Sequence, residues 1–589
     1  MIHKFHIPVL GLGFSIDTPL KVAKYGISSV VSIVDDELVE RMRAHHCHQS
    51  GEVYQPISKK ETDSRAKRIT AYLNLLNLLV DRQFDAIQQM PFEAGNALCT
   101  YFELLPDESP VKHGYELMMD FPEGERKTIF QNLLRLHMEK GSIDVNIMSK
   151  VDRVNPKYQS DFTEGENTEA LTALRGFANS SLSSSLTLSA GMNPRLYSYI
   201  TQFDDFFPDD RGQLKKKIML KVSDFRSALI QAKFLAKKGL WVSEFRVESG
   251  LNCGGHAFAT EGYLLGPILE EFKQNRERMQ QELFLLYKEA LKEREMITGV
   301  APEQKLSVQG GIGTAEENKF LMKHYQLSST GWGSPFLLVP EVTNVDDQTL
   351  KQLTAAGEHD FYLSNASPLG IPFNNFRGSS IEQERLRRIA EGKPGSPCTK
   401  KYLVSDTEFT KEPICTASSK YQQRKIKALE ALQLPADVFK KEFEAITEKI
   451  CLCEGLCSSA YQRNGLLKPK ESKAVAICPG PNLAYFSAVY TFGQMVDHIY
   501  GRVNLLDNVN RPHMFMKELE LYMTYLHTEV SNLLRNFSDK KKLQLIKFKD
   551  QLLAGIHYYK QLADKLSFDR DKIGETLSKA EHHLALTTL

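Results

Sequence analysis

The chain has 589 residues, 42% of them hydrophobic, and its 74 Lys and Arg residues nearly balance its 73 Asp and Glu residues. This composition excludes an intrinsically disordered chain, and a net charge of +1 gives no electrostatic reason to bind nucleic acid. The sequence contains no apolar run long enough to cross a bilayer and does not open with a secretion signal, so we expect a mature cytoplasmic protein without membrane association.

Short β-rich runs alternate with amphipathic helical patterns through the first 340 residues. Several runs are rich in Val, Ile and Leu without strict alternation, which is typical of parallel strands covered on both faces. Eight strand–helix units in succession predict an α/β fold, the (β/α)₈ TIM barrel. The runs are IPVLGLG from Ile7, SSVVSIV from Ser28, IDVNIMS from Ile143, SLTLSAG from Ser185, KIMLKVS from Lys217, SEFRVESG from Ser243, KLSVQGG from Lys305 and YQLSSTG from Tyr325.

The predicted barrel carries a large helical insertion, because more than 100 residues separate its second and third runs. The intervening sequence is amphipathic from about residue 40 to 140 and predicts a helical layer or lid. A second long helical pattern, from Gly266 to Glu295, follows the sixth run, and its mixed charges indicate a solvated face.

Strand–helix alternation ends after about residue 345. We therefore divide the chain into a barrel at 1–345, a loop-rich region with cysteines at 346–480 and a mostly helical C-terminal region at 481–589. In the helical region, apolar residues at alternating steps of four and three form one stripe, which core or dimer packing explains best. The stripe consists of Leu519, Met523, Leu526, Val530 and Leu533.

Six of the nine cysteines follow residue 390, which is enough thiols for one four-cysteine zinc or iron–sulfur site. The spacing Cys451-x-Cys453-x₃-Cys457 matches neither ferredoxins nor zinc ribbons. We therefore interpret the group as packed reduced thiols and expect no metal. The six are Cys398, Cys415, Cys451, Cys453, Cys457 and Cys478.

The segment ESGLNCGGHAFAT, residues 248–260, follows the sixth run. Gly254 and Gly255 allow the backbone to turn and to approach a ligand closely. His256 then projects from the C-terminal rim of a barrel strand, where barrel enzymes place their catalytic groups. A histidine there can transfer protons near neutral pH, and a hydrogen-bonded loop histidine is the alternative interpretation.

Two glycine-rich segments follow the seventh and eighth runs. In VQGGIGTAEEN, Gly310 and Gly311 expose backbone N–H groups at the start of a helix, a geometry that binds phosphate. STGWGSPF adds Gly333 and Ser334. Barrel enzymes commonly hold a phosphate between the loops after strands seven and eight, so the two segments together predict a phosphate site.

Five segments, taken in chain order, resemble the flavin-dependent nitronate monooxygenase (2-nitropropane dioxygenase) family and its relatives, the flavin enoyl-acyl-carrier-protein reductases. The segments are IPVLGLGFSIDTPLKVAKYG, DVNIM, CGGH, GGIGT and GWGSPF. The resemblance covers less than half of the chain, within the first 345 residues. A further segment, KICLCEGLCSSA, is similar to one that follows the barrel in longer members, including trans-acting reductases of polyunsaturated-fatty-acid and polyketide synthesis.

The resemblance implies an FMN-binding barrel. His256 would sit over the flavin as the proton-transfer group. Lys221 would neutralise flavin or phosphate charge, with a surface lysine as the alternative. The other implied cofactor-binding residues are Gly11, Gly13 and Phe14 along the ring, Asn146 hydrogen-bonded to it, Gly254 and Gly255 beside His256, and Gly310, Gly311, Gly333 and Ser334 around the phosphate.

Three functions agree with these residues. The first is an FMN-dependent oxidoreductase of the nitronate monooxygenase type, acting on a small molecule with His256 as its proton-transfer residue. The second is a trans-acting enoyl reductase that takes electrons from NADPH and acts on enoyl thioesters bound to the carrier protein of a fatty-acid or polyketide synthase. The third is a non-catalytic flavin-binding protein that acts on a partner. A homodimer is compatible with all three.

Overall fold

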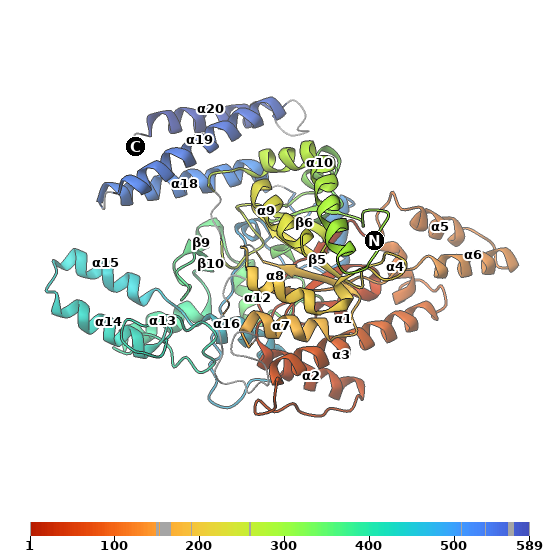
Figure 1. Ribbon diagram of the computed structural model, residues 1–589, viewed down its shortest axis with the longest axis horizontal. Coiled ribbons are helices and arrows are strands. Elements are labelled where there is room, and N and C mark those ends of the chain that lie inside the picture. The colour runs from red at the N-terminus through yellow and green to blue at the C-terminus, as the bar shows by residue number, and fades with distance from the viewer. Residues whose placement is uncertain are drawn as a thin grey trace.

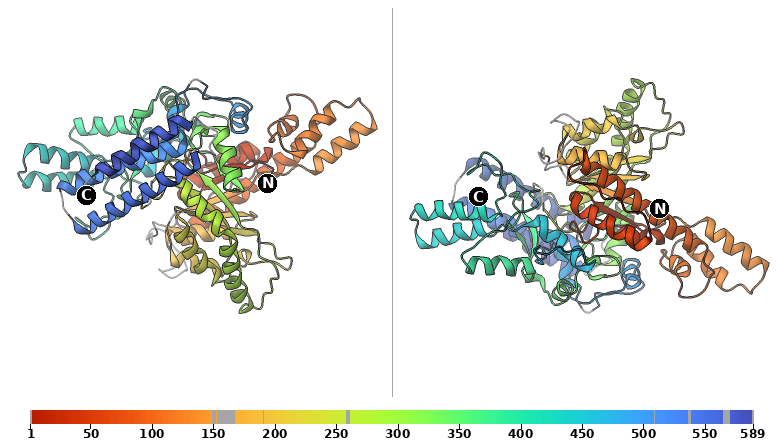
Figure 2. Two further views of the ribbon diagram at one scale, coloured as in Figure 1. Left: turned by 90° about the horizontal axis from the view of Figure 1, so that it is seen from above. Right: turned by 90° about the horizontal axis from the view of Figure 1, so that it is seen from below.

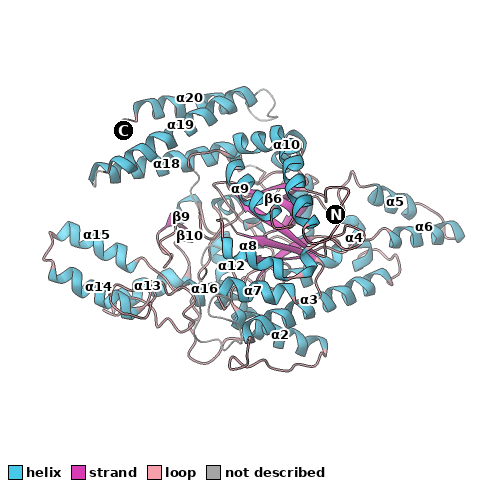
Figure 3. Ribbon diagram, in the orientation of Figure 1, coloured by secondary structure: helices cyan, strands magenta, loops and turns pink. Residues whose placement is uncertain are grey.

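Eight parallel strands close into a barrel in chain order, and the last strand pairs with the first (Figures 1 and 3). The computed structural model describes residues 2–148, 152, 167–189, 191–257, 261–507, 509–535, 538–563 and 570–587. The closed barrel and its surrounding helices confirm the predicted (β/α)₈ fold. The strands are β1 (Phe5–Ile7), β2 (Ser28–Ser32), β3 (Ile143–Ile147), β4 (Ser184–Leu188), β5 (Lys216–Val222), β6 (Val242–Glu248), β7 (Lys305–Gln309) and β8 (Ser329–Gly331).

The first and last strands differ from their predicted bounds. β1 ends at Ile7, where the predicted run begins, because Pro8 has no N–H to continue the ladder. β8 is confined to three residues, and Tyr325 instead ends the preceding helix. The glycines of IPVLGLG therefore lie in the loop after β1. Residues 149 and 190, at the ends of two predicted runs, lie outside the described residues.

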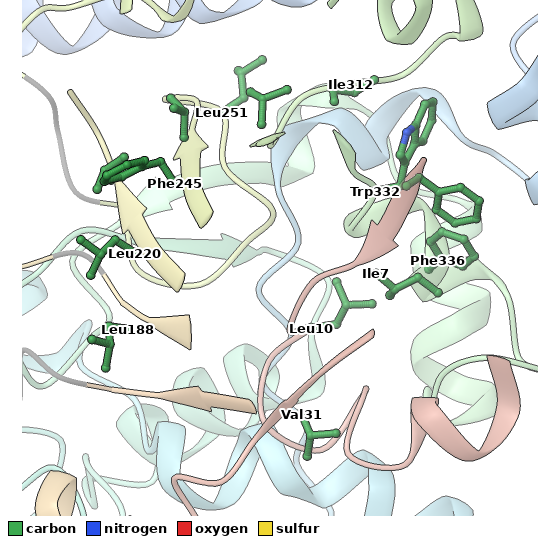
Figure 4. Packing of buried hydrophobic residues seen from close by; sticks show 14 of the residues in the cluster. Ile7, Leu10, Val31, Leu188, Leu220, Phe245, Leu251, Ile312, Trp332 and Phe336 are labelled. Atoms are coloured by element: carbon green, nitrogen blue, oxygen red, sulfur yellow. The ribbon is translucent and has the colours of Figure 1, made fainter. Parts of the chain in front are cut away.

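Side chains alternate along the strands between the outer helices and the barrel axis. Phe245 of β6 packs on Phe272 of α10 (Leu265–Lys292), with ring centroids 5.8 Å apart. Figure 4 shows Leu188, Leu220 and Phe245 along the same side of three neighbouring strands, β4 to β6. The apolar residues of these strands thus bind the helical layer.

The barrel interior below the mouth is polar. The Nε of Arg246 donates to Glu244 at 3.0 Å and to the hydroxyl of Ser307, on the next strand, at 3.4 Å. Arg246 is 3% exposed, so its charge is compensated inside the barrel. Burial raises the pKa of Asp144 above its usual value, and the nearby positive charge of Arg246 reduces this shift.

The helices that follow the strands have the expected caps. Asp224 caps α9 (Phe225–Ala236) by accepting the N–H of Ser227, and Thr314 caps α11 (Ala315–His324) by accepting the N–H of Glu317. Predicted helical patterns after β1, β5 and β7 are thereby confirmed. The helices of this layer are α1 (Thr18–Val22), α7 (Glu169–Ala178), α8 (Pro194–Tyr199), α9 (Phe225–Ala236), α10 and α11 (Ala315–His324).

The predicted insertion between β2 and β3 is helical. Its longest helix, α3 (Ser64–Gln88), buries Tyr72, Leu73 and Leu76 and packs against α2 (Asp36–Ser50) and α7. The last three helices surround a separate apolar cluster that includes Phe102 and Tyr115, and they project from one side of the molecule (Figure 2). The helices are α2 (Asp36–Ser50), α3 (Ser64–Gln88), α4 (Ala97–Glu103), α5 (Pro110–Met119) and α6 (Glu125–Leu136).

The C-terminal half of the chain reaches the mouth of the barrel at two places. α16 (Leu452–Arg463) crosses the loop after β1, where Gly13 donates its N–H to the carbonyl of Leu456 at 3.0 Å. An antiparallel pair, β9 (Phe361–Ser364) and β10 (Phe373–Phe376), reaches the loop after β6. The barrel mouth is therefore covered by residues far along the chain.

The last three helices lie together against α10 (Figures 1 and 2). In the predicted stripe, Leu519, Leu526 and Leu533 are buried and the other two residues are half-buried, so the stripe forms core within this chain. No helix among the described residues is long and apolar enough to span a membrane. The remaining helices are α12 (Asp347–Thr354), α13 (Ser380–Ala390), α14 (Ser419–Ala431), α15 (Ala436–Thr447), α17 (Phe492–Tyr500), α18 (Met514–Arg535), α19 (Asp539–Leu562) and α20 (Arg570–Leu586).

Candidate active site

A cavity lies between the C-terminal ends of the barrel strands and the C-terminal half of the chain. It encloses about 1310 Å³ of empty space, part of it open to solvent. Its floor is polar and comes from strand ends: Ser32, Asn146, Thr187, Lys221, Arg246, Glu248 and Gln309. Its roof is mainly apolar and comes from the C-terminal half: Leu369, Ile371, Phe373, Tyr402, Leu403, Leu452, Cys453, Leu456 and Cys478.

The structure brings half of the twelve predicted site residues to this cavity. They come from the loop after β1, from β3, from β5 and from the loop after β6, which are far apart in the sequence. The residues that line it are Gly11, Asn146, Lys221, Gly254, Gly255 and His256. The predicted residues that do not line it are Gly13, Phe14, Gly310, Gly311, Gly333 and Ser334.

The loop that carries CGGH is held by the C-terminal half. The N–H of Gly255 donates to the carbonyl of Cys478 at 3.0 Å, and the N–H of Asn374 donates to the carbonyl of Gly255 at 2.9 Å. Gly254 has a φ of +116°, and a Cβ there would lie 2.1 Å from the Cys478 oxygen. Glycine is required at 254 for both reasons. Residues 258–260, the last three of this predicted segment, lie outside the described residues.

His256 is fixed by two contacts with the roof. Its Nε2 lies 2.7 Å from the hydroxyl of Ser367, and its ring packs edge-on against Phe373 with centroids 5.1 Å apart. Desolvation, with a smaller effect from the charge of Lys221, lowers the pKa of His256 from 6.5 to about 4. At neutral pH the side chain is therefore a neutral imidazole, which can accept a proton.

Lys221 is paired within the floor. Its Nζ lies 2.8 Å from Glu248, and the other oxygen of that carboxylate accepts from Gln309 at 2.7 Å. The lysine is thus not simply a surface residue, since it lines the cavity with its charge matched by a neighbouring strand. Its predicted role toward a flavin or phosphate stays a prediction.

The loops after β7 and β8 support the CGGH loop from beneath. A Cβ at Gly310 would lie 2.7 Å from the Cα of Asn252, and one at Gly333 would lie 2.7 Å from the Cβ of Cys253. Ser334 donates its hydroxyl to the carbonyl of Cys253 at 3.0 Å. These close contacts give the glycines a packing role, and their predicted phosphate contacts stay a prediction.

The loop after β1 is packed in the same way. A Cβ at Gly13 would lie 2.9 Å from the Cβ of Ala460, so α16 can approach only a glycine here. Phe14 is 1% exposed, and a Cβ at Gly11 would lie 2.7 Å from the Cδ2 of its ring. Gly11 alone of these three residues lines the cavity.

C-terminal residues that were not predicted from the sequence hold the loop after β7 in place. Arg511 donates to the carbonyl of Gly311 at 2.6 Å, to Asn482 at 2.8 Å and to the buried carboxylate of Glu317 at 2.7 Å. The N–H of Gly480 donates to the hydroxyl of Ser334 at 2.7 Å. The turn signal CPGPN, at residues 478–482, was the one sequence sign that a loop enters this region.

Another missed contact joins α18 to both ends of the loop after β6. The buried carboxylate of Glu518 accepts the N–H of Gly250 at 2.6 Å and the N–H of Leu265 at 2.8 Å. Burial raises the pKa of Glu518 to about 7, while the two N–H groups oppose that shift. The helical C-terminus thus helps to position the segment that carries His256.

No protein-family model matches the sequence, and no curated protein matches it. Two solved structures are similar to the chain in a fold comparison. The enoyl reductase domain of MlnA from the macrolactin biosynthesis cluster of Bacillus amyloliquefaciens has 13% identity and a TM-score of 0.32, covering 71% of this chain and 88% of that one. Nitroalkane oxidase from Streptomyces ansochromogenes has 8% identity and a TM-score of 0.34, covering 86% of this chain and 96% of that one. Both TM-scores are below 0.5, so neither likeness assigns an activity or a residue role to this chain.

Proposed function

We propose that the protein is an FMN-dependent oxidoreductase of the nitronate monooxygenase type, with its active site in the cavity at the barrel mouth. One observation carries the proposal: residues singled out in four separate segments, including Gly11, Asn146 and His256, line a single cavity. Barrel enzymes place their active sites at this end of the strands. The resemblance of these segments to flavin enzymes supports FMN as the cofactor.

The residues present fit the ring of a flavin. Pro8, Val9 and Gly11 provide an apolar wall, while Asn146 and Lys221 provide hydrogen-bonding groups on the floor. When bound, FMN would supply the transfer of an electron pair to or from the substrate.

His256 would move the proton that accompanies this transfer. With Nε2 as the donor to the Ser367 oxygen, Nδ1 would be the atom that takes or returns the proton. The neutral state of the imidazole makes His256 a base in the free enzyme at pH 7.

An enoyl reductase is the second candidate, and the roof favours it. Leu369, Ile371, Leu403, Leu452 and Leu456 present an apolar surface opposite the polar floor. Such a surface suits the acyl chain of an enoyl thioester better than a small nitronate, because it offers contact area along the length of the chain. Electrons would then come from NADPH, and the acyl chain would arrive on a carrier protein.

The visible spectrum of the purified protein tests the cofactor, and two substrates separate the activities. We expect the purified protein to show the spectrum of an oxidised flavin. An oxidoreductase of the nitronate monooxygenase type should turn over a nitronate with oxygen. An enoyl reductase should instead oxidise NADPH without oxygen when an enoyl thioester is added. A colourless protein that takes up no FMN in titration would refute the proposal. A flavin that neither substrate system reduces would support the non-catalytic alternative.

The variant His256→Ala tests the proton-transfer role. We expect it to retain flavin and to lose turnover by about 10²- to 10⁴-fold, the usual contribution of general acid–base catalysis. His359→Ala is a matched control, because the His359 side chain is 84% exposed on the surface. Unchanged turnover in His256→Ala would remove His256 from this role.

A further inference from the structure

A small pocket lies directly beside the cavity of the candidate active site, and we call it the side pocket. It encloses about 410 Å³ of empty space, compared with about 1310 Å³ for the cavity, and both volumes include space open to solvent. Four residues line both spaces, so the two spaces adjoin. These residues are Val34, Met148, Tyr402 and Leu403.

The walls of the side pocket come from two strand ends and one helix of the barrel layer. Ile33 follows β2 and Ile147 ends β3, and both are at most 1% exposed. Ala170 and Ala173, three positions apart on α7, are each 2% exposed. Protein interiors are close-packed, so large apolar side chains usually fill the space between a strand and its helix. The two alanines instead leave space beside the cavity.

Contacts between α7 and α3 prevent α7 from moving to fill this space. A Cβ at Gly176 would lie 2.6 Å from the Cγ2 of Ile69 on α3, so the two helices are as close as glycine allows. Arg175 donates to both carboxylate oxygens of Asp63, at 2.6 and 3.1 Å, at the start of α3. The position of α7 is therefore fixed, and a larger side chain at 173 would enter the side pocket.

The charged groups at the side pocket are compensated within the chain. Arg65 is 2% exposed, and its Nη1 lies 3.1 Å from Glu169 and 3.3 Å from Asp36. The hydroxyl of Tyr402 donates to Asp36 at 2.8 Å. A buried charge that is already paired does not require a charged ligand. The other described residues that line the side pocket are apolar, so an apolar group suits it best.

The side pocket and His256 lie on opposite sides of the barrel mouth. His256 follows β6, and three or four strands separate β6 from β3 and β2 in the closed barrel. Eight tilted strands about 4.8 Å apart make a ring roughly 15 Å across. A substrate that reacts at His256 and also fills the side pocket must therefore be long and unbranched.

We propose that the side pocket binds the far end of an unbranched acyl or alkyl chain whose other end reacts beside His256. The position of the reacting end rests on the proposed function, and the side pocket adds a selection for chain length. Each methylene buried there should raise the affinity about fourfold. Ala170 and Ala173 are the residues that admit the chain.

Isothermal titration calorimetry with saturated thioesters tests the side pocket without turnover. The N-acetylcysteamine thioesters of butanoic, octanoic and dodecanoic acids have no double bond to reduce, so the measurement reports binding alone. We expect the affinity to increase along this series, and dodecanoyl to bind at least about tenfold more tightly than octanoyl. Equal affinities for the three chains would overturn the proposal.

Ala173→Leu and the milder Ala170→Val fill the side pocket. Ala173→Leu should weaken binding of the dodecanoyl thioester about tenfold, because its added carbons take the place of two or three methylenes, and Ala170→Val should weaken it less. Binding of the butanoyl thioester should not change. Ala428→Leu, on the exposed side of α14, is the control and should bind all three chains like the wild type. An equal loss for butanoyl and dodecanoyl, or no loss for either, would overturn the proposal.

Photochemical cross-linking locates the chain in the wild-type protein and does not depend on the folding of a variant. A dodecanoyl thioester with a diazirine at its far end should label α7 or the ends of β2 and β3. Labels confined to other segments would overturn the proposal. Binding of this kind without turnover of any enoyl thioester or nitronate would refute the proposed function alone, whereas turnover without chain-length preference would refute the side pocket alone.

Discussion

The burial of His256 has a measurable effect on acid stability. Its pKa is about 4 in the folded chain and 6.5 in the unfolded chain. The unfolded chain therefore binds the proton first as the pH falls. Stabilisation from the neutral imidazole is complete above pH 6.5 and is lost between pH 6.5 and 4. Since each pKa unit is worth about 1.4 kcal/mol, the free energy involved is about 3 kcal/mol.

Urea unfolding of the wild type and His256→Gln at pH 7 and pH 4.5 measures this effect. Glutamine can still hydrogen-bond Ser367 but does not titrate. Between pH 7 and pH 4.5 we expect the free energy of unfolding to decrease in both proteins. The decrease should be larger in the wild type than in the variant by about 2 to 3 kcal/mol. Other titrating groups are common to both proteins and cancel in the comparison. Equal acid sensitivity would show that the roof does not desolvate His256.

Two further predictions concern the contacts that close the site, each measured by urea unfolding. Gly254→Ala places a Cβ 2.1 Å from the carbonyl oxygen of Cys478 and should lower the free energy of unfolding by more than about 2 kcal/mol. Gly255 also has a positive φ, but a Cβ there would meet open space, so Gly255→Ala should lower the free energy of unfolding by about 1 kcal/mol. Equal losses would mean that the clash relaxes easily. Arg511→Met removes the ion-pair partner of the buried Glu317 carboxylate and should lower the free energy of unfolding by about 3 to 5 kcal/mol. Arg511→Lys keeps the positive charge and should lower it less. A decrease below about 1 kcal/mol in Arg511→Met would show that Arg511 does not stabilise the loop after β7.

The barrel was predictable because its signals are local. Apolar runs bounded by turns place strands, and residues such as Asp224 and Thr314 cap the helices that follow. The ends of β1 and β8 were less predictable. An apolar run continues past Ile7, and only the missing N–H of Pro8 and the pairing of neighbouring strands set the true limit.

The candidate site was predictable in part. His256 and its two glycines follow a strand, so the barrel topology alone brings them to the mouth. The packing roles of Gly310 and Gly333 were not predictable, because each depends on how closely the CGGH loop crosses above it. The contacts of Arg511 and Glu518 join segments about 200 to 270 residues apart, and no local pattern encodes them.

By itself, the sequence determined that this chain of balanced charge folds as an eight-stranded barrel with a helical insertion, and it placed His256 after the sixth strand, at the mouth of that barrel. The tertiary structure decided what faces that side chain. The C-terminal half covers the mouth, and that cover desolvates His256 and pairs it with Ser367. The physical reason is that strand and helix formation depend on neighbours along the chain, whereas burial and the meeting of side chains depend on packing between distant segments.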